Sequence, residues 1–524
     1  MRNAQMRELM NGAWILSLGG LITKILSAVY RIPFQNLVGD TGFYIYQQVY
    51  PIYGLGMVLA LSGLPVYVSK LVAAAGSSEA QRRVARRCIS LLAALGGLAF
   101  VLIFAGARPL ALAMADVQLT PLIRCVAFMF LLLPILGGAR GYFQGVGNMV
   151  PTASSQVLEQ LVRVAIIIAA AVCGRYFHWS LYLTGTVAMS GALFGGTAAA
   201  VLIFPRLQVA LAGRLLPRRA QLPTRDFVRH FLIDGGAFVL FSALLILLQL
   251  VDSFTVTRGL ALHGLAPAVA RAAKGVYDRG QPLVQLGLVV ATALTQSLLP
   301  SLSRSNHYGQ KTAFTRISVM LLHLTVVFGV LASLALAVVM PNLNRFLFGD
   351  AQGSGVLAMY VLSVALVAAV NALSSLLQSQ DQFRTPTVAL VLALLTKITF
   401  NLPLTARWGT FGSALASNLA WLVALATVYA AIPGAIRHNF WHNGFGRRLA
   451  LTALALCVSG ALLGQLLPPS GRLAGLVHCL LIGLGAGAVT LLVAYQQQLL
   501  ALREILVIPA GRKIMKLLSQ FKRG

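Results

Sequence analysis

Residues 88–106 read CISLLAALGGLAFVLIFAG, a run without a charged side chain that directly follows the basic stretch QRRVARR at residues 81–87. A helix of about 20 apolar residues crosses the hydrocarbon core of a bilayer, so this run predicts one membrane-spanning helix. The arginines before it predict that this end faces the cytoplasm, because basic residues gather on that side of membrane proteins. An apolar run flanked by basic residues is therefore the unit to look for elsewhere in the chain.

The same unit recurs along the whole chain of 524 residues, of which 58% are hydrophobic and 10% charged. A soluble domain carries about 25% charged residues, so this composition excludes a water-soluble globular fold. We expect an all-α polytopic membrane protein with about fourteen transmembrane helices. The predicted spans are residues 12–32, 44–68, 88–106, 120–142, 156–174, 181–204, 231–256, 277–300, 317–340, 355–378, 386–405, 410–432, 449–467 and 473–495.

Charge placement predicts the orientation of these helices. Most of the 41 lysines and arginines fall in alternate connections that share one side if both termini are cytoplasmic. This arrangement assigns Arg140 to a cytoplasmic connection and Lys274 to an outer one. The net charge of +29 then reflects topology, and we expect no nucleic-acid partner. The predicted location is the bacterial cell membrane, with the N-terminus and the C-terminus in the cytoplasm.

The chain also carries signs of two halves. Its longest connection, residues 205–230, is basic and contains three prolines. The motifs FQG and PT occur at residues 143–152, and LQS and PT occur with nearly the same spacing at residues 377–387. Transporters built from two repeated bundles show such internal similarity. Five cysteines and eight histidines are scattered without metal-ligand spacing, so we expect no metal and no other cofactor.

The first predicted helix carries charge inside the membrane. Five small or polar residues recur on one face of it at spacings of three and four: Ser17, Gly20, Lys24, Ser27 and Arg31. Lys24 lies about twelve residues into the helix, which is roughly 18 Å deep. A charge at the bilayer centre costs roughly 2.5–3.5 kcal/mol, so Lys24 and Arg31 are candidate substrate ligands. The alternatives are snorkelling side chains or a structural ion pair.

Four further polar side chains lie inside predicted helices: Asp252, Arg279, Lys397 and Asn401. Arg279 presents a planar fork suited to a phosphate group, and a local pair with Asp278 is the alternative. Glu159 and Arg163 are four residues apart on the span 156–174, which predicts a structural pair between them. Asp252, Arg279, Lys397 and Asn401 complete the candidate binding site begun by Lys24 and Arg31.

Two stretches carry a resemblance to a known family. Residues 62–70 read SGLPVYVSK, after LVGD at residues 37–40, and residues 275–286 read GVYDRGQPLVQL. They resemble the polysaccharide-biosynthesis flippases, in the Gram-positive branch that includes stage V sporulation protein B-like proteins and the MurJ-type lipid II flippase YtgP. This branch belongs to the multidrug/oligosaccharidyl-lipid/polysaccharide exporter superfamily. The likeness in helix number and order covers nearly the whole chain.

The resemblance implies a division of the chain into five parts. Two six-helix lobes, residues 1–204 and 231–432, would surround a central V-shaped cavity and be joined by the cytoplasmic linker 205–230. Two additional transmembrane helices within residues 433–495 would line a groove for a polyprenyl tail. Residues 496–524 would form a basic cytoplasmic tail.

The resemblance also assigns roles to single residues. Three positions match the family: Lys24 is the basic residue of helix one, Asp252 the acidic residue late in helix seven, and Arg279 the arginine of helix eight. Two positions depart from the Gram-negative members, because an arginine of their helix two aligns near Leu55 and the second arginine of their helix one aligns with Tyr30. The second departure leaves Arg31 one residue away from the family position.

Lys397 is a third departure, because some relatives carry a sodium-binding acid on this helix. Sodium coupling is therefore in doubt. We hypothesise that the Lys397 ammonium takes the place of that cation and pairs with Asp252 or with another acceptor such as Asn401. Independent snorkelling or cavity lining by Lys397 is the alternative.

The resemblance implies a flippase that moves an anionic polyprenyl-diphosphate-linked sugar, lipid II first, to the outer leaflet by alternating access for peptidoglycan synthesis. Its partners would be the lipid-linked oligosaccharide and bilayer lipids, and we expect a monomer. A flippase for a capsule or teichoic-type repeat unit is the first alternative. A multidrug/cation antiporter would need a carboxylate deep in the first lobe. A glycosyltransferase would need catalytic acids in an outer loop, whereas Asp40, Asp116 and Asp350 are isolated in the sequence.

Overall fold

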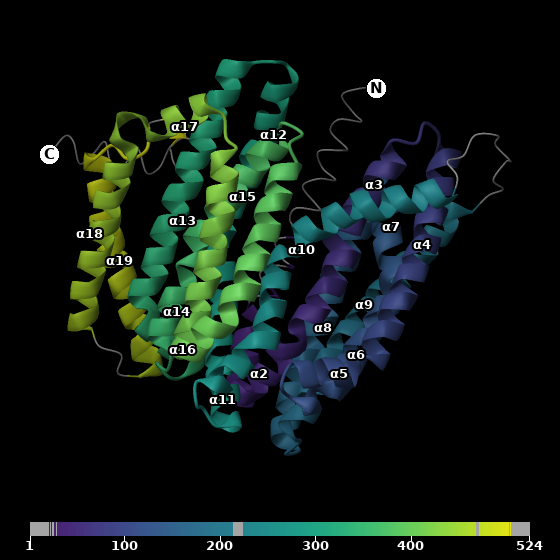
Figure 1. Ribbon diagram of the computed structural model, residues 1–524, viewed down its shortest axis with the longest axis horizontal. Helices are drawn as coiled ribbons and strands as arrows, with labels where there is room; N and C mark the ends of the chain where they lie inside the picture. Colours follow the sequence, from purple (N-terminus) through teal and green to yellow (C-terminus); the bar gives the residue numbers. More distant parts are fainter. Residues whose placement is uncertain are drawn as a thin grey trace. The chain divides into compact units, whose positions relative to one another are not determined.

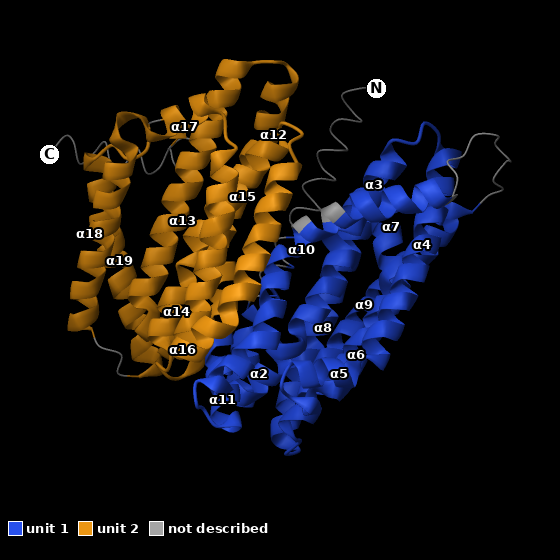
Figure 2. Ribbon diagram, in the orientation of Figure 1, with its two compact units in different colours: residues 1–278 blue, residues 279–524 orange. Residues whose placement is uncertain are grey.

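The computed structural model describes residues 20, 23, 26, 27, 29–212, 224–467, 471–501, 503 and 504. Every regular element in these ranges is a helix, so the expected all-α fold is confirmed (Figure 1). The chain divides into two compact units, residues 1–278 and residues 279–524 (Figure 2). The boundaries of the predicted lobes stay predictions.

Unit 1 consists of long helices that are interrupted by short ones. Its α-helices are α2 (Arg31–Met57), α3 (Leu64–Ala73), α4 (Ser78–Ala105), α5 (Ala107–Ala113), α6 (Thr120–Ala127), α7 (Leu133–Gly145), α8 (Val150–Tyr176), α9 (Leu181–Leu211), α10 (Thr224–Leu262) and α11 (Pro267–Asp278). A π-helical turn at Val58–Ser62 separates α2 from α3, directly before Pro65. Proline at the start of a helix fits because its missing N–H would have no partner there.

Unit 2 begins at Arg279 and, like unit 1, consists of long helices with short ones between them. Its α-helices are α12 (Gly280–His307), α13 (Lys311–Phe348), α14 (Ser354–Val361), α15 (Ser363–Gln378), α16 (Arg384–Ala430), α17 (Gly434–Trp441), α18 (Phe445–Leu466) and α19 (Arg472–Gln496). In both units the long helices run alongside one another (Figure 1).

Twelve helical segments in the described ranges are long and apolar enough to cross a membrane. One of them, α16, contains two predicted spans, because its backbone turns at Trp408 and Gly409. The hydroxyl oxygens of Thr405 and Ser413 meet at 2.6 Å across this turn, so α16 is a helical hairpin with two arms. The predicted span 12–32 lies largely outside the described residues. The total of fourteen helices therefore stays a prediction.

The connection between the first two predicted spans differs from expectation. We expected helix one to end at residue 32 and helix two to begin at residue 44, but both continue to a turn at Gly39. Gly39 has φ 69°, a conformation that glycine adopts without strain. Gln35 Nε2 donates to Asp40 Oδ1 at 2.8 Å across the turn. The residues between the two predicted spans are therefore helical on both sides of Gly39.

The predicted linker 205–230 also differs at its ends. Helix α9 continues through Pro205 to Leu211, and α10 begins at Thr224. Residues 213–223 lie outside the described ranges, as do residues 505–524 of the predicted tail.

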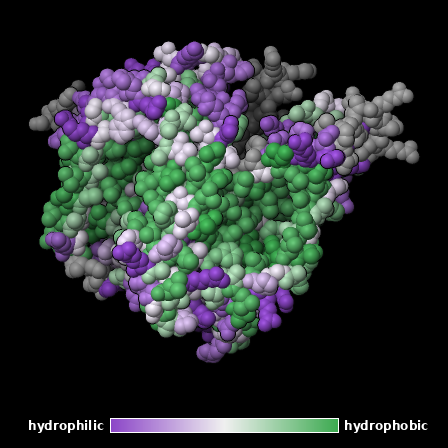
Figure 3. Space-filling view, viewed as in Figure 1, coloured by the Kyte–Doolittle hydropathy of each residue, from purple (hydrophilic) through white to green (hydrophobic). Residues whose placement is uncertain are grey.

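The outer surface of each unit is apolar where a membrane would contact it. Leu102 and Val201 of unit 1 are 63% and 69% exposed, and Leu484 of unit 2 is 72% exposed. Figure 3 shows hydrophobic residues over the middle of the visible helices and hydrophilic residues towards their ends. Large exposed apolar surfaces of this kind mark contact with a membrane.

Small residues bring two helices of unit 1 together where buried charges lie. A Cβ atom on Gly195 would lie 2.6 Å from the carbonyl oxygen of Glu159, and one on Gly191 would lie 2.9 Å from that of Arg163. Helix α9 therefore packs backbone to backbone against α8, as small residues permit in membrane helices. This contact fixes the part of α8 that enters the candidate site.

Candidate functional site

The turn at Gly39 places the end of the first helix against the second arm of α2. Tyr46, Tyr50 and Tyr53 are spaced by four and three residues, so they share one face of that arm, and all are buried. Tyr30 faces them from the first helix, with its hydroxyl oxygen 3.0 Å from that of Tyr46. We call the group formed by these four tyrosines, Arg31 and Arg163 the arginine–tyrosine cluster.

Arg31 is the most unusual member of the cluster. Its side chain is 0% exposed, and its Cζ lies 4.3 Å from the centre of the Tyr50 ring. The Tyr30 and Tyr50 hydroxyls are close, but within the described residues no guanidinium nitrogen has a partner in hydrogen-bonding geometry. A buried donor without a partner costs about 1–3 kcal/mol, and more when it is charged. Cation–π contact offsets part of this cost and leaves the N–H donors for another group.

Arg163 enters the cluster from the middle of α8. Its Nη2 donates to Ser27 Oγ at 3.0 Å, and its Cζ lies 4.7 Å from the Tyr53 ring centre and 5.2 Å from that of Tyr30. The predicted pair with Glu159 is wrong, because Glu159 binds a cation on another helix. The four-residue spacing suggested the local partner, whereas the fold supplies a closer one.

That cation is Arg140, which we had assigned to a cytoplasmic connection. Helix α7 instead carries Arg140 into the core, where it is fully buried. Its three nitrogens donate to Glu159 Oε2 at 2.7 Å, Ser155 Oγ at 3.0 Å and the Ala60 carbonyl at 3.3 Å. The Arg140 charge is thus matched and hydrogen-bonded, which is the arrangement of a structural ion pair.

A second matched pair lies near the end of α11. Lys274 donates to both Asp278 carboxylate oxygens, at 2.9 and 2.8 Å, and both residues belong to α11, so Lys274 is not in a loop. The pair of Asp278 with Arg279 stays a prediction. Asp252, also buried, accepts a hydrogen bond from Tyr277 at 3.2 Å. The Asp278 carboxylate interacts electrostatically with Arg31 and Asp252, so these charges share one neighbourhood of unit 1.

Arg279 of unit 2 is fully buried, and its guanidinium nitrogens have hydrogen-bond partners. Its Nη1 and Nη2 donate to the two Asp350 carboxylate oxygens at 2.8 and 2.9 Å, and Nη1 also donates to Asn344 Oδ1 at 3.1 Å. Partial burial raises the pKa of Asp350, but hydrogen bonds from Arg279 and from the Gln352 N–H outweigh it, and the pKa lies below its ordinary value. The role of Arg279 as a phosphate ligand stays a prediction.

Lys397 and Asn401 lie in the first arm of the α16 hairpin, and both are fully buried. The Lys397 ammonium donates to the Ser413 carbonyl at 3.4 Å and to the Ser417 hydroxyl in the second arm. Thr405 donates to the Asn401 carbonyl at 2.5 Å. Asp252 belongs to unit 1, so its predicted pairing with Lys397 stays a prediction.

Lys24 lies outside the described residues, and its depth in the membrane stays a prediction. The three acids that were isolated in the sequence have partners in the fold. Asp40 accepts from Gln35, Asp350 accepts from Arg279, and Asp116 accepts from the Tyr182 hydroxyl at 2.6 Å. These hydrogen bonds stabilise turns and contacts between helices.

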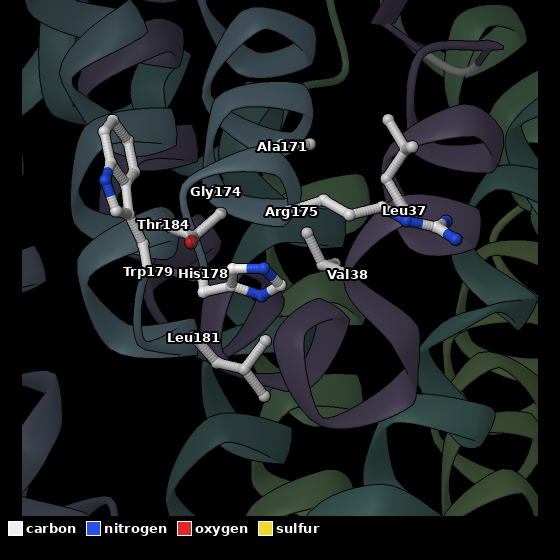
Figure 4. Close-up of a pocket in the computed structure, with 9 residues that line it drawn as sticks. All are labelled: Leu37, Val38, Ala171, Gly174, Arg175, His178, Trp179, Leu181 and Thr184. Atoms are coloured by element: carbon white, nitrogen blue, oxygen red, sulfur yellow. The ribbon is translucent and has the colours of Figure 1, made fainter.

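A small cavity of about 330 Å³ lies beside the turn at Gly39 (Figure 4). Its lining includes Arg175, His178 and Trp179 from the end of α8 and the connection to α9. The volume is at the lower end of small-molecule sites, which span about 300–1,000 Å³. No member of the arginine–tyrosine cluster lines this cavity, so it is a separate feature.

Reasoning from the sequence missed Arg163 and the tyrosines as parts of the site. The spacing of Tyr46, Tyr50 and Tyr53 could have indicated the tyrosines, because it places all three on one face of the predicted span 44–68. The missing information was which helix lies opposite that face.

The amino-acid sequence is similar to a family of membrane proteins and to two proteins of Bacillus subtilis. The family described as "Polysaccharide biosynthesis protein" matches residues 9–306. The chain is 33% identical to the "Uncharacterized membrane protein YabM" of Bacillus subtilis, over 97% of this chain and 96% of the relative. It is 26% identical to "Lipid II flippase MurJ" of the same organism, over 80% of this chain and 81% of the relative.

A solved structure agrees in fold. "Lipid II flippase MurJ, inward closed conformation" superposes with a TM-score of 0.64 at 14% identity, over 91% of this chain and 97% of that structure. The relatives and solved structures whose names state an activity are lipid II flippases and multidrug transporters. The expectation of a transporter, and not an enzyme, is thereby confirmed.

Proposed function

The chain belongs to the polysaccharide biosynthesis protein family, and from that premise we propose that it flips an anionic polyprenyl-diphosphate-linked sugar across the membrane. One observation carries the proposal: Arg31 is buried in unit 1 with guanidinium nitrogens that have no hydrogen-bond partner in the described residues. A diphosphate is a suitable partner, because a guanidinium fork matches the geometry of phosphate oxygens.

The rest of the arginine–tyrosine cluster supports this chemistry. Arg163 adds a second buried cation, and both cations lie on tyrosine rings that hold them when no anion is bound. Moving a diphosphate into a low-dielectric space is costly unless cations and N–H donors receive it. The cluster supplies both without an acid of its own.

The proposed transport mechanism is alternating access. The site would bind the diphosphate and sugar from the cytoplasmic leaflet and release them to the outer leaflet, and no covalent bond would form or break. In the proposed setting the protein is a monomer in the bacterial cell membrane, surrounded by bilayer lipids, with both termini in the cytoplasm.

Lipid II is the first candidate substrate, and a capsule or teichoic-type repeat unit is the second. The name of the MurJ relative supports lipid II for that relative, at 26% identity to this chain. Depletion of the protein in cells would test the choice, because the substrate should accumulate on the cytoplasmic side. Accumulation of lipid II supports the first candidate, and accumulation of another polyprenyl-linked intermediate supports the second. No accumulation of any such intermediate would contradict the proposal.

The multidrug/cation antiporter is the remaining alternative. It requires a carboxylate that can bind a cationic drug or a proton. The buried Glu159 of α8 is matched by Arg140, and Asp278 is matched by Lys274. Matched carboxylates are poor sites for an exchangeable cation, so the geometry favours an anionic substrate.

Lys397 leads to a separate proposal about energy coupling. Its ammonium is held by carbonyl and hydroxyl oxygens of the hairpin, which are the ligand types that a cation prefers. We propose that Lys397 acts as a built-in cation and that transport needs no sodium. Asp252→Asn and Lys397→Gln should each reduce transport about tenfold, and the double variant should recover part of the loss if the two charges pair. A strict sodium requirement, or losses that simply add, would contradict this proposal.

A further inference from the structure

Unit 2 contains a cavity of about 1190 Å³ that lies apart from the charges discussed above. Its walls come from the first turns of α13, from α17 and its connection to α18, and from residues that follow α19. Four lining residues are lysine or arginine: Lys311, Arg316, Arg448 and Arg503. The cavity is therefore a cationic pocket, and none of the predicted site residues lines it.

The acid in this lining does not cancel the cations. Among the lining residues, all of which the structure describes, Glu504 is the one carboxylate. Its Oε1 lies 2.8 Å from His323 Nδ1, and its Oε2 accepts from the Ala501 N–H at 2.7 Å. The His323 ring stacks on Phe445 with 4.1 Å between ring centres. Both Glu504 carboxylate oxygens are thus engaged, one with His323 and the other with Ala501.

The start of α13 adds to the preference for an anion. Lys311 and Thr312 form the first turn of this 38-residue helix and line the cavity. The N-terminus of a helix carries partial positive charge and presents backbone N–H groups, so it favours anions such as phosphate. Two turns further along the helix, Val319 and Met320 make the lining apolar. A ligand that fits both parts has an anionic head and an apolar body.

We propose that this cavity binds the phosphate headgroup of an anionic membrane lipid. The predicted topology puts the basic ends of α13 and α18 on the cytoplasmic side, and anionic lipids are enriched in that leaflet. Basic pockets between membrane helices on this side bind such headgroups. The volume exceeds that of ordinary small-molecule sites, which agrees with a lipid headgroup and the first part of its chains. Binding of this lipid would be the same whichever substrate the protein transports.

The test is a titration of the full-length protein in neutral detergent with fluorescent phosphatidylglycerol, against unlabelled phosphatidylcholine and inorganic pyrophosphate as competitors. Phosphatidylglycerol should bind at least about tenfold more tightly than phosphatidylcholine. Arg316→Gln and Arg448→Gln should each weaken it about fivefold, which is the contribution of one basic residue near a lipid surface. The matched control is Arg437→Gln, an exposed arginine of α17 outside the lining, and it should change affinity less than about twofold.

Equal affinity for the two lipids, or an equal loss in the Arg437→Gln control, would overturn the proposal. Displacement by pyrophosphate at concentrations near those of the lipid would assign the cavity to a soluble phosphate compound and overturn the lipid assignment. A measurement without substitutions guards against misfolded variants. Hydrogen exchange at residues 311–316 and 439–448 should slow in phosphatidylglycerol nanodiscs relative to phosphatidylcholine nanodiscs, and no difference would also overturn the proposal.

Discussion

Arg31 in unit 1 and Arg279 in unit 2 are both 0% exposed, yet the groups that face them differ. Arg279 donates to two carboxylate oxygens of Asp350 and to Asn344. Arg31 lies on the Tyr50 ring, and in the described residues its nitrogens have no hydrogen-bond partner. One buried guanidinium group thus lies against a carboxylate, and the other lies against an aromatic ring.

The presence or absence of a matched carboxylate separates the buried arginines of this fold into two groups. A buried arginine with a matched carboxylate is already satisfied, and an added anion would have to displace that carboxylate. A buried arginine on aromatic rings keeps its N–H donors for a ligand that arrives later. By this criterion we propose that Arg140 and Arg279 are structural, whereas Arg31 and Arg163 bind the substrate.

The largest expected effect comes from Arg31→Ala. We expect transport of the lipid-linked sugar into the outer leaflet of vesicles to fall about 100-fold, because loss of charged hydrogen bonds to phosphate costs about 3 kcal/mol. Membrane insertion and melting temperature should stay near those of the wild type, since removal of this guanidinium leaves no carboxylate unmatched. Arg108→Ala is the control, because Arg108 is exposed at an end of unit 1. Wild-type transport by Arg31→Ala would make Arg31 a packing residue.

Arg163→Lys tests the difference between Arg163 and Arg140 within unit 1. A lysine keeps the charge but loses the flat contact with Tyr53 and Tyr30, so transport should fall about tenfold. Arg140→Lys is the matched variant, and it should lower the melting temperature because it weakens the bond to Glu159. If Arg140→Lys reduces substrate affinity and Arg163→Lys does not, the assignment of ligand and structural cation must be reversed.

Substitutions of Arg279 and Asp350 test whether this ion pair is structural. We expect Arg279→Lys and Asp350→Asn each to lower the melting temperature by about 2–6 °C, since each weakens a partly buried ion pair. Transport per folded molecule should change less than about threefold. Should Asp350→Asn raise substrate affinity, the guanidinium it releases must bind the phosphate, and Arg279 would join Arg31 as a ligand.

The smallest expected effect is the pH dependence of the Arg279–Asp350 pair. The pKa of Asp350 is lowered in the fold, so the pair stabilises unit 2 at neutral pH, and this contribution is lost as pH falls through the folded-state pKa. The melting temperatures of the wild type and Asp350→Asn should therefore begin to converge below about pH 4, the ordinary aspartate value, and should meet once the pH is below the folded-state pKa of Asp350. A difference that persists undiminished below that folded-state pKa would exclude the carboxylate charge as its cause.

The sequence predicts the helices well and the buried charge pairs poorly, for a physical reason. Hydrophobic length is a local property, so the spans of both units could be read from composition, except where Gly39 turns the chain within residues that read as a loop. The partner of a charge is a property of the fold. Glu159 binds Arg140 on another helix instead of Arg163 on its own, and Asp350 lies 71 residues from Arg279. No spacing rule connects such positions.

We propose that Arg31, and not Arg279, receives the phosphate of the substrate. A polyprenyl diphosphate without sugar isolates this contact, and its affinity for the full-length protein in nanodiscs is the direct measurement. We predict that Arg31→Gln weakens binding about 100-fold, while Arg279→Gln stays within about threefold at equal folded fraction. Equal losses in the two variants, or a larger loss in Arg279→Gln, would contradict the claim.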